Sequence, residues 1–214
     1  MLDKSAIILA GGTSKGFPED KGTILLDNKP LIRRAFDIVD PIVDEVIIVT
    51  NTQERVDKYA KLLPETAKFA IDKQSMQGPL IGAITGFETA QGKYTLLMPY
   101  DSPFVNEELA MLLLDLAVGK TAAVPRNPNN EIEPLCSVYQ TKSVLETAKQ
   151  VAAEGAVDLQ TLVENLLGVR YISTLVIEQI DPDLRSFFSV NTPLDLKRAA
   201  VMLQGRPKTS KTKR

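Results

Sequence analysis

The sequence contains no histidine and a single cysteine, Cys136, and these two scarcities exclude whole classes of chemistry. Without histidine there is no histidine-containing catalytic triad, no histidine general base and no HExxH zinc site. One cysteine excludes an internal disulfide and a thiolate metal cluster, and its apolar surroundings favour a structural side chain over a reactive one. Any chemistry must therefore use carboxylates, lysines, backbone amides or a bound cation.

The sequence also lacks an excess of either charge and any long apolar run. Lys and Arg number 25 and Asp and Glu 27, a formal net charge of −2, so we expect neither nucleic acid nor a membrane surface as a partner. No stretch approaches the ~20 apolar residues of a membrane-spanning helix. The short apolar run after Lys4 does not have the pattern of a signal peptide, and we expect a cytoplasmic protein.

The chain does contain enough apolar material for a full core, since 44% of its 214 residues are hydrophobic. That length suits one domain, which we assign to residues 1–204. The remaining residues, 205–214, are basic and lack apolar anchors, so we expect a disordered tail there.

In the first half, short apolar runs alternate with longer stretches of helical periodicity, the pattern of βαβ units in a mostly parallel sheet. The runs are apolar at consecutive positions, as strands covered on both faces require. The expected strands are Ala6–Ala10, Val46–Thr50, Lys68–Ile71, Tyr94–Met98 and Thr121–Val124. The expected helices are Leu31–Val39, Gln53–Leu63, Leu80–Ala90 and Asn106–Val118.

The second half is less regular. A polar, proline-rich stretch, "PRNPNNEIEP", indicates a substrate-facing loop. After it we expect a strand over 135–140, helices over 142–153 and 158–167, and strand structure over 169–177. A last strand and turn over 187–192 precede a final helix that begins near Pro193.

Ligands of such sheets bind beyond the carboxyl ends of the parallel strands, so the residues that follow each strand are candidates for a functional site. Gly11 and Gly12 follow the first strand, and Asn51, Asp72 and Asp101 follow the next three. We expect a glycine loop, an amide and two carboxylates to converge at one edge of the sheet.

The glycine loop has two interpretations. A tight turn without Cβ atoms lets backbone N–H groups approach a phosphate, and Lys21 beyond it could reach a triphosphate as a point charge. The alternative is an ordinary turn followed by a solvated Asp20–Lys21 pair. The spacing of Gly11, Gly12 and Gly16 fits neither a Walker A motif nor GxGxxG, which argues against a P-loop kinase and a Rossmann dehydrogenase.

Asp101 stands between two prolines in "MPYDSPF", at the end of an expected strand. A rigid carboxylate there suits Mg²⁺, which binds through one or two carboxylates together with substrate phosphates. The same aspartate could instead cap the helix that begins near Asn106. In "QGPLIGAITG", Gly82 and Gly86 share one helical face, where small residues allow close packing or the approach of a flat ligand.

Taken together, "LAGGTSKGFPEDKGTILLDNKPLI", "GPLIGAITG", "YDSP" and "NTPLDL" resemble the molybdenum cofactor guanylyltransferases, over nearly the whole chain. The resemblance implies a Rossmann-like three-layer α/β/α fold of the nucleotide-diphospho-sugar transferase type. It implies GTP and molybdopterin, with or without molybdenum, as substrates and Mg²⁺ as cofactor. Proteins that deliver the pterin or accept the finished cofactor are further implied partners.

The resemblance also implies roles for individual residues. The implied nucleotide-binding positions are Leu9, Ala10, Gly11, Gly12, Ser14, Lys15, Lys21, Asn51, Asp72 and Asp101. Of these, Lys21 and Asp101 are the implied catalytic residues, and Asp101 is the implied magnesium ligand. On the acceptor side the implied residues are Pro79, Glu133, Pro134 and Asn191.

The chain departs from the family's loop pattern, LAGG-x-S-x-R-M-G-x-D-K, at three positions. Gly16 stands where the family has arginine, Phe17 where it has methionine and Pro18 where it has glycine. Lys15 could supply a charge but not the planar fork of the missing arginine. The alternatives that stay open are another phosphorylated acceptor (a sugar phosphate or a phospholactate-like acid), CTP-dependent cytidylyl transfer to molybdopterin, and a catalytically weakened GTP-binding protein.

Overall fold

The structure, a computed structural model, describes residues 3–12, 16–17, 19–72 and 78–204. Ser14, Lys15, Pro18 and the basic tail 205–214 lie outside these ranges, so what the sequence predicts for them stays a prediction.

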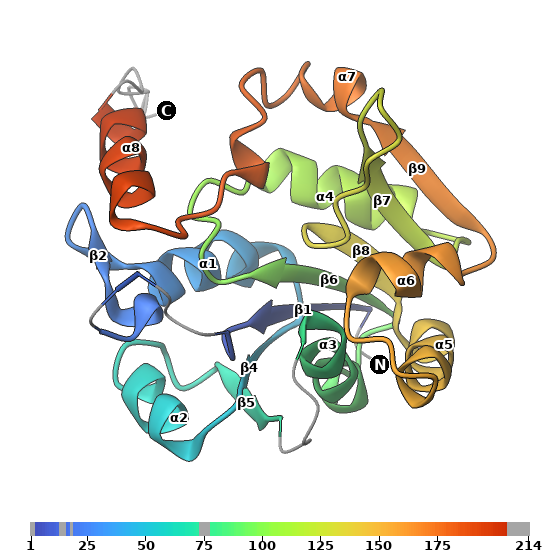
Figure 1. Cartoon of the computed structure of the whole chain (residues 1–214), viewed down its shortest axis with the longest axis horizontal. Coiled ribbons are helices and arrows are strands. Elements are labelled where there is room, and N and C mark those ends of the chain that lie inside the picture. The colour runs from blue at the N-terminus through green and yellow to red at the C-terminus, as the bar shows by residue number, and fades with distance from the viewer. Residues whose placement is uncertain (1–2, 13–15, 18, 73–77, 205–214) are drawn as a thin grey trace, which may run out of the picture.

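A seven-stranded sheet with the order β5-β4-β1-β6-β8-β7-β9 runs through the molecule (Figure 1). The strands are β1 (Lys4–Leu9), β4 (Glu45–Thr50), β5 (Lys68–Ile71), β6 (Tyr94–Pro99), β7 (Ala122–Arg126), β8 (Ser137–Gln140) and β9 (Val169–Ser173). β1 pairs in parallel with both β4 and β6, and β8 is antiparallel to both β6 and β7. The expected mostly parallel sheet is therefore confirmed, with β8 as a reversed strand inside it.

Helices cover both faces of this sheet. α1 (Leu31–Val39) and α4 (Glu107–Leu116) pack on one face, and α3 (Pro79–Thr89), α5 (Thr141–Ala153) and α6 (Leu159–Glu164) pack on the other (Figure 1). In β1, Ala6 and Ile8 belong to the first of these cores, whereas Ile7 belongs to the second. Successive side chains of a strand point to opposite faces, which explains why β1 is apolar at consecutive positions and confirms the three-layer architecture.

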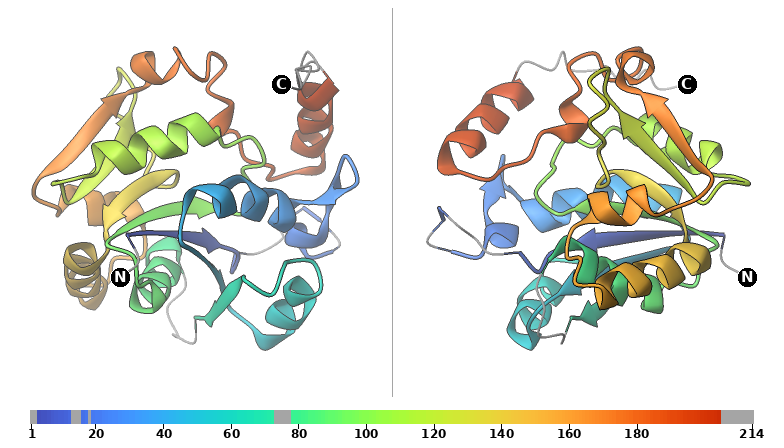
Figure 2. Two further views of the ribbon diagram at one scale, coloured as in Figure 1. Left: turned by 180° about the vertical axis from the view of Figure 1, so that it is seen from behind. Right: turned by 45° about the vertical axis from the view of Figure 1, so that its right-hand side comes forward.

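The remaining elements surround this core. They are η1 (Lys21–Thr23), β2 (Leu25–Leu26), β3 (Lys29–Pro30), η2 (Asp40–Ile42), α2 (Gln53–Ala60), α7 (Thr174–Ile177), η3 (Arg185–Phe187) and α8 (Pro193–Gln204). β2 and β3 form a hairpin whose turn residues, Asp27 and Asn28, both have a positive φ. α8 lies beside this hairpin and away from the sheet (Figures 1 and 2).

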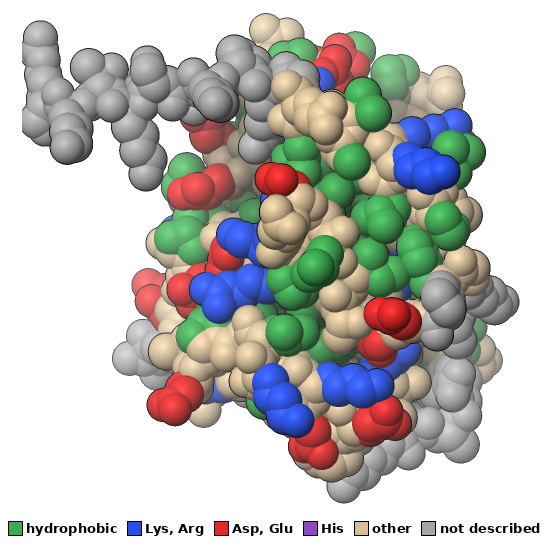
Figure 3. Space-filling view, turned by 90° about the vertical axis from the view of Figure 1, so that its left-hand side faces the viewer, with side chains coloured by type: hydrophobic (Ala, Val, Ile, Leu, Met, Phe, Trp, Pro, Cys, Tyr) green, Lys and Arg blue, Asp and Glu red, His purple; other side chains and the backbone are tan. Residues whose placement is uncertain are grey.

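The helices and the surface charges bear on whether the chain could span a membrane or bind a strongly charged partner. Within the ranges that the structure describes, no helix has both the length and the apolar character needed to cross a bilayer. Seen from the side at which α2 and α8 lie, the described acidic and basic side chains are interspersed (Figure 3).

Three expectations for the second half of the chain are wrong in detail. The strand expected over 135–140 begins only at Ser137, because Cys136 adopts a left-handed conformation with φ of 61°. The segment expected as strand over 169–177 is β9 followed by the helix α7, whose first turn is capped by the hydroxyl of Ser173. The strand expected at the start of 187–192 is instead the end of η3 followed by an irregular stretch.

Candidate functional site

A cavity of about 370 Å³ opens at the carboxyl ends of β1, β4 and β6. In the parallel register, Leu9 pairs with Val49 on one side and with Pro99 on the other, so these three strands end side by side. The candidate residues that line the cavity are Leu9, Gly11, Gly12, Asn51, Asp72, Pro79 and Asp101. The expected convergence of strand ends is therefore present, while the roles of these residues in binding stay predictions.

Helix α3 forms one wall of the cavity and lies very close to β1. A Cβ atom at Gly86 would come within 2.7 Å of the Cγ2 atom of Ile7, so glycine is needed there for close packing. Gly82 lies one turn nearer the cavity, which it lines, and its Cβ would be 3.4 Å from the Cδ2 atom of Leu9. The close approach of α3 brings Pro79, at its first turn, to the edge of the cavity.

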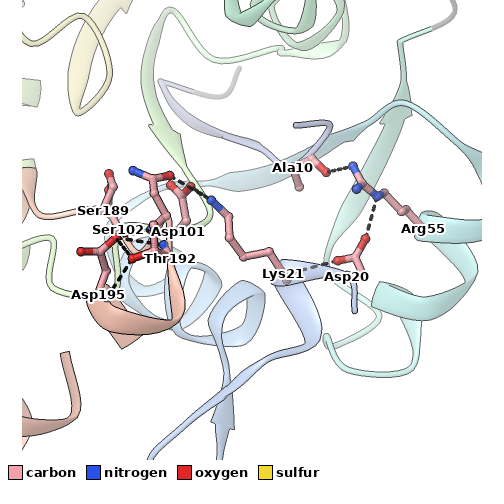
Figure 4. A network of polar contacts seen from close by, with 11 residues as sticks. Ala10, Asp20, Lys21, Arg55, Asp101, Ser102, Ser189, Thr192 and Asp195 are labelled. Atoms are coloured by element: carbon pink, nitrogen blue, oxygen red, sulfur yellow. Dashed lines mark hydrogen bonds and ion pairs between the residues drawn. The ribbon is translucent and has the colours of Figure 1, made fainter. Parts of the chain in front are cut away.

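Lys21 and Asp101 meet at this edge of the sheet (Figure 4). Asn191 joins them through a hydrogen bond with Lys21. The ammonium group of Lys21 forms an ion pair with the carboxylate of Asp101 and donates a 3.1 Å hydrogen bond to Oδ1 of Asn191. The side chains of Lys21 and Asp101 are only 7% and 13% exposed. The alternative, in which Lys21 and Asp20 form a solvated surface pair, is therefore wrong for Lys21, because its ammonium group is buried against the carboxylate of Asp101.

Neighbouring hydrogen bonds hold Asp101 and Asn191 in place. The N–H group of Val190 donates to the carbonyl of Asp101 at 2.9 Å, which ties the end of β6 to the segment before α8. The N–H groups of Asn191 and Thr192 donate to the carboxylate of Asp195. The hydroxyl of Thr192 and these N–H groups hold the pKa of Asp195 below its ordinary value.

The structure rules out the capping alternative for Asp101. The first turn of α4 is capped by the side chain of Asn106, whose Oδ1 accepts hydrogen bonds from the N–H groups of Glu108 and Leu109. Asp101 instead directs its carboxylate to Lys21 at the cavity.

Sequence reasoning missed Arg55, which lies on α2 beside the glycine loop. Its Nε atom is 2.7 Å from Oδ2 of Asp20, and its Nη1 atom donates to the carbonyl of Ala10 at 3.1 Å and to Oδ1 of Asn51 at 3.2 Å. Tyr59, one helical turn further on, donates its hydroxyl to Oδ1 of Asp20 at 2.5 Å. The spacing of Arg55 and Tyr59 is the available sequence signal, since residues four apart share one face of a helix and both lie on α2.

The predicted acceptor-side residues Glu133 and Pro134 lie just before Leu135, which lines the cavity, although neither belongs to its described lining. Their carbonyl groups accept hydrogen bonds from the hydroxyls of Ser137 and Tyr139, at 2.5 and 2.6 Å. Burial, followed by the nearby charge of Glu131, raises the pKa of Glu133. These contacts fix the backbone of the segment next to the cavity.

Residues 6–169 match the MobA-like NTP transferase domain, and this range contains the glycine loop, Lys21 and Asp101. The chain belongs to this nucleotidyltransferase family. It is 33% identical to a probable molybdenum cofactor guanylyltransferase of Methanosarcina acetivorans, over 91% of this chain and 88% of that protein. It is 30% identical to the molybdenum cofactor guanylyltransferase of Desulfosudis oleivorans, over 94% of this chain and 96% of that protein.

Solved structures share the fold of this MobA-like chain. Molybdopterin-guanine dinucleotide biosynthesis protein A from Archaeoglobus fulgidus superposes with a TM-score of 0.80 at 24% identity, covering 95% of this chain and all of that one (100%). The 4-diphosphocytidyl-2C-methyl-D-erythritol synthase from Anaerococcus prevotii superposes with a TM-score of 0.71 at 15% identity, covering 94% and 96%. The predicted fold class, a three-layer α/β/α nucleotidyltransferase, is confirmed.

Gly16 stands where the family's loop pattern has arginine, and it lies within the part of this MobA-like chain that the structure describes. It has a φ of 88°, a conformation that residues with a side chain rarely adopt. A Cβ atom here would have room, 3.8 Å from both the carbonyl oxygen of Asn191 and the Cδ of Pro193. Any residue with a Cβ atom, arginine included, would therefore meet backbone strain at this position and not a clash at Cβ.

Proposed function

We propose that this chain transfers GMP from GTP to the terminal phosphate of molybdopterin, with or without molybdenum, and releases pyrophosphate. The product is the guanine dinucleotide form of the cofactor. The meeting of Lys21, Asp101 and Asn191 beside a glycine-walled cavity is the observation that carries the proposal. Membership of the MobA-like family and the names of its relatives support the choice of GTP and molybdopterin.

Transfer of a nucleotidyl group needs no protein nucleophile. An oxygen of the pterin phosphate attacks the α-phosphorus of GTP, the bond from that phosphorus to the β-phosphate oxygen breaks, and pyrophosphate leaves. Positioning and charge neutralisation do most of the work in such reactions. This requirement suits a chain without histidine, whose Cys136 has a pKa raised by burial to about 12 and therefore stays a neutral thiol.

Residues that line the cavity, together with Lys21 at its edge, would each hold a different part of GTP. The backbone N–H groups of Gly11 and Gly12 would bind phosphate oxygens, and Lys21 would neutralise part of the triphosphate charge. Asn51 and Asp72, at the ends of β4 and β5, would hold the nucleoside. In the structure Lys21 compensates Asp101, a buried carboxylate that is costly to leave without a counter-charge. Its flexible stem allows the same ammonium group to turn to a triphosphate.

The residues at the cavity edge also fit Mg²⁺. Among the residues that the structure describes, there is no cluster of three or more histidine, cysteine, aspartate or glutamate side chains that could hold a metal ion. Mg²⁺ does not require such a group, because it binds through one or two carboxylates and substrate phosphates. Asp101 and Asn191 already direct their side-chain oxygens to a cation, the ammonium of Lys21, and would be the protein ligands. Bound Mg²⁺ would supply positive charge to the phosphate oxygens.

The proposal is tested by pyrophosphate release. GTP, CTP, ATP and UTP are each incubated with the protein and Mg²⁺, alone, with molybdopterin, with molybdate-loaded molybdopterin and with a sugar phosphate. We expect release only with GTP and a pterin. Release with CTP and a pterin would replace guanylyl by cytidylyl transfer, and release with the sugar phosphate would replace the acceptor. GTP binding without release from any pair would instead indicate a catalytically weakened protein.

A further inference from the structure

The guanidinium group of Arg55 joins three segments around the cavity. It pairs with Asp20 at the exit of the glycine loop, with the carbonyl of Ala10 at the end of β1, and with the side chain of Asn51 at the end of β4. The Arg55 and Asp20 side chains are 15% and 9% exposed, so their ion pair is largely shielded from solvent. A planar fork with several donors can serve three acceptors at once, which the single ammonium of a lysine cannot do in the same geometry.

The hydroxyl of Tyr59 and a backbone N–H group of η1 also hold the carboxylate of Asp20. Its Oδ1 atom accepts hydrogen bonds from the hydroxyl of Tyr59 and, at 2.9 Å, from the N–H group of Gly22. Tyr59 is fully buried, and burial followed by this hydrogen bond raises its pKa, so the hydroxyl stays a donor. A Cβ atom at Gly22 would lie 2.5 Å from the Tyr59 hydroxyl, which shows how tightly η1 is pressed against α2.

This arrangement determines which carboxylate Lys21 meets. Because Arg55 compensates Asp20, the neighbouring Lys21 is directed to Asp101. Figure 4 shows the two side chains extending in opposite directions, Asp20 toward Arg55 and Lys21 toward Asp101. Fixing the Asp20 carboxylate therefore fixes the point from which Lys21 reaches across the cavity edge.

Arg55 also sets the orientation of the Asn51 amide. An asparagine side chain has one accepting and one donating end, and in the structure Oδ1 of Asn51 accepts from Arg55. The amide NH₂ group is then the end left for a ligand, and Asn51 lines the cavity. Such an orientation suits a hydrogen-bond acceptor on the nucleoside.

We propose that Arg55 is a positioning residue for nucleotide binding, and that Asp20, Arg55 and Tyr59 together form a positioning clamp. The clamp acts through Lys21 and Asn51 and does not itself contact the nucleotide. The inference rests on the proposed function in one respect, namely that the cavity binds a nucleoside triphosphate.

Three variants separate the two routes by which the clamp acts, one through Asn51 and the other through Lys21. Arg55→Lys keeps a cation for Asp20 but loses the fork that reaches Ala10 and Asn51. Tyr59→Phe keeps the ring but removes the hydroxyl that holds Asp20. Arg55→Gln removes the charge altogether. Arg33→Lys is the matched control, because Arg33 pairs with Asp37 on α1 and is not among the residues that line the cavity.

The readouts are nucleotide affinity by calorimetry and the split between kcat and KM for pyrophosphate release. We expect Arg55→Lys to raise the Kd and KM for GTP about tenfold, the effect of one hydrogen bond in a shielded site, with kcat within about threefold. We expect Tyr59→Phe to lower kcat more than it raises KM, because its effect reaches the nucleotide through Lys21. Arg55→Gln combines both effects, and Arg33→Lys changes neither quantity.

A merely structural role would lower the melting temperature and the active fraction while leaving Kd and KM unchanged. Unchanged affinity in folded Arg55→Lys would therefore overturn the proposal, and this conservative variant decides the matter even where Arg55→Gln does not fold. The wild type is first titrated with all four nucleoside triphosphates. Binding of CTP alone overturns guanylyl transfer but leaves the clamp to be tested with CTP, whereas binding of none overturns both proposals.

Discussion

Replacing Gly86 by alanine measures how closely α3 must lie on β1. The new Cβ would lie 2.7, 2.8 and 3.0 Å from three side-chain carbons of Ile7. Ile7 is completely buried in β1, which is paired with β4 and β6 on its two sides, so it cannot retreat. Overpacking costs about 1–3 kcal/mol in general, and three contacts at 3.0 Å or less put this site in the upper part of that range, about 2–3 kcal/mol. Removing a glycine from a helix gains about 1 kcal/mol. We expect Gly86→Ala to lower the free energy of unfolding by about 1–2 kcal/mol.

Gly82 provides the matched control on the same face of α3. Its Cβ would meet the Cδ2 atom of Leu9 at 3.4 Å and the Cγ1 atom of Val49 at 3.9 Å, which are ordinary contacts. Gly82→Ala therefore keeps most of the helical gain and stabilises the fold by up to about 1 kcal/mol. The two variants therefore differ by about 1–3 kcal/mol, which for a chain of this length is about 2–12 °C in melting temperature. Urea and thermal unfolding measure the difference, and equal stability of Gly86→Ala and Gly82→Ala would show that α3 does not need glycine for its close approach to β1.

Three further predictions concern the site and its surroundings. Asp101→Asn should keep the circular dichroism of the wild type but lower Mg²⁺-dependent turnover about 100-fold or more, whereas the exposed control Asp115→Asn should keep wild-type turnover. Turnover of Asp101→Asn within threefold of that control would remove Asp101 from the site. Burial alone would raise the pKa of Glu45, but hydrogen bonds led by that of Lys68 outweigh it and hold the pKa below the ordinary 4.5. The stability that Glu45 contributes is therefore present above about pH 4.5 and is lost as the pH falls through the lowered folded-state pKa. On acidification the urea midpoint of Glu45→Gln should fall less steeply than that of the wild type. An equally steep fall would contradict a stabilising role of the Glu45 carboxylate. Gly16→Arg and Gly16→Ala should each cost about 1 kcal/mol of stability, because both enter a left-handed backbone, and neither should tighten GTP binding in calorimetry; a gain with arginine alone would show that the charge outweighs the strain.

The location of the cavity could be predicted from the sequence because it depends on local signals. Alternating strand and helix patterns imply a parallel sheet, and a parallel sheet places the residues after Leu9, Thr50 and Pro99 at one edge. Phosphate binding is one of two interpretations of the glycines at those ends, and the carboxylate of Asp101 suits Mg²⁺; both stay predictions. None of these inferences required knowledge of which side chains touch.

The errors arise where a capping hydrogen bond or a long-range contact overrides the preference of the residues for one secondary structure. Residues 174–177 are mostly β-branched and favour a strand by propensity, yet the hydroxyl of Ser173 caps the first turn of α7. The direction of β8 cannot be read from four apolar and polar residues, because it depends on pairing with both β6 and β7.

The same limit hid the polar contacts of the site. The Lys21–Asp101 pair joins residues 80 positions apart, and Arg55 meets Asp20 only because α2 packs beside η1. The sequence predicts that Lys21 and Asp101 lie near a bound ligand, but the pairing between them follows from the folded chain alone.

The mass of the pterin product is the most direct measurement of the central claim. The protein is incubated with Mg²⁺, molybdopterin and GTP labelled in the α-phosphate, and the pterin fraction is analysed by mass spectrometry and for label. We expect a pterin that has gained one GMP unit and carries the label, with one pyrophosphate released for each product formed. An unchanged, unlabelled pterin in the presence of bound GTP would contradict GMP transfer.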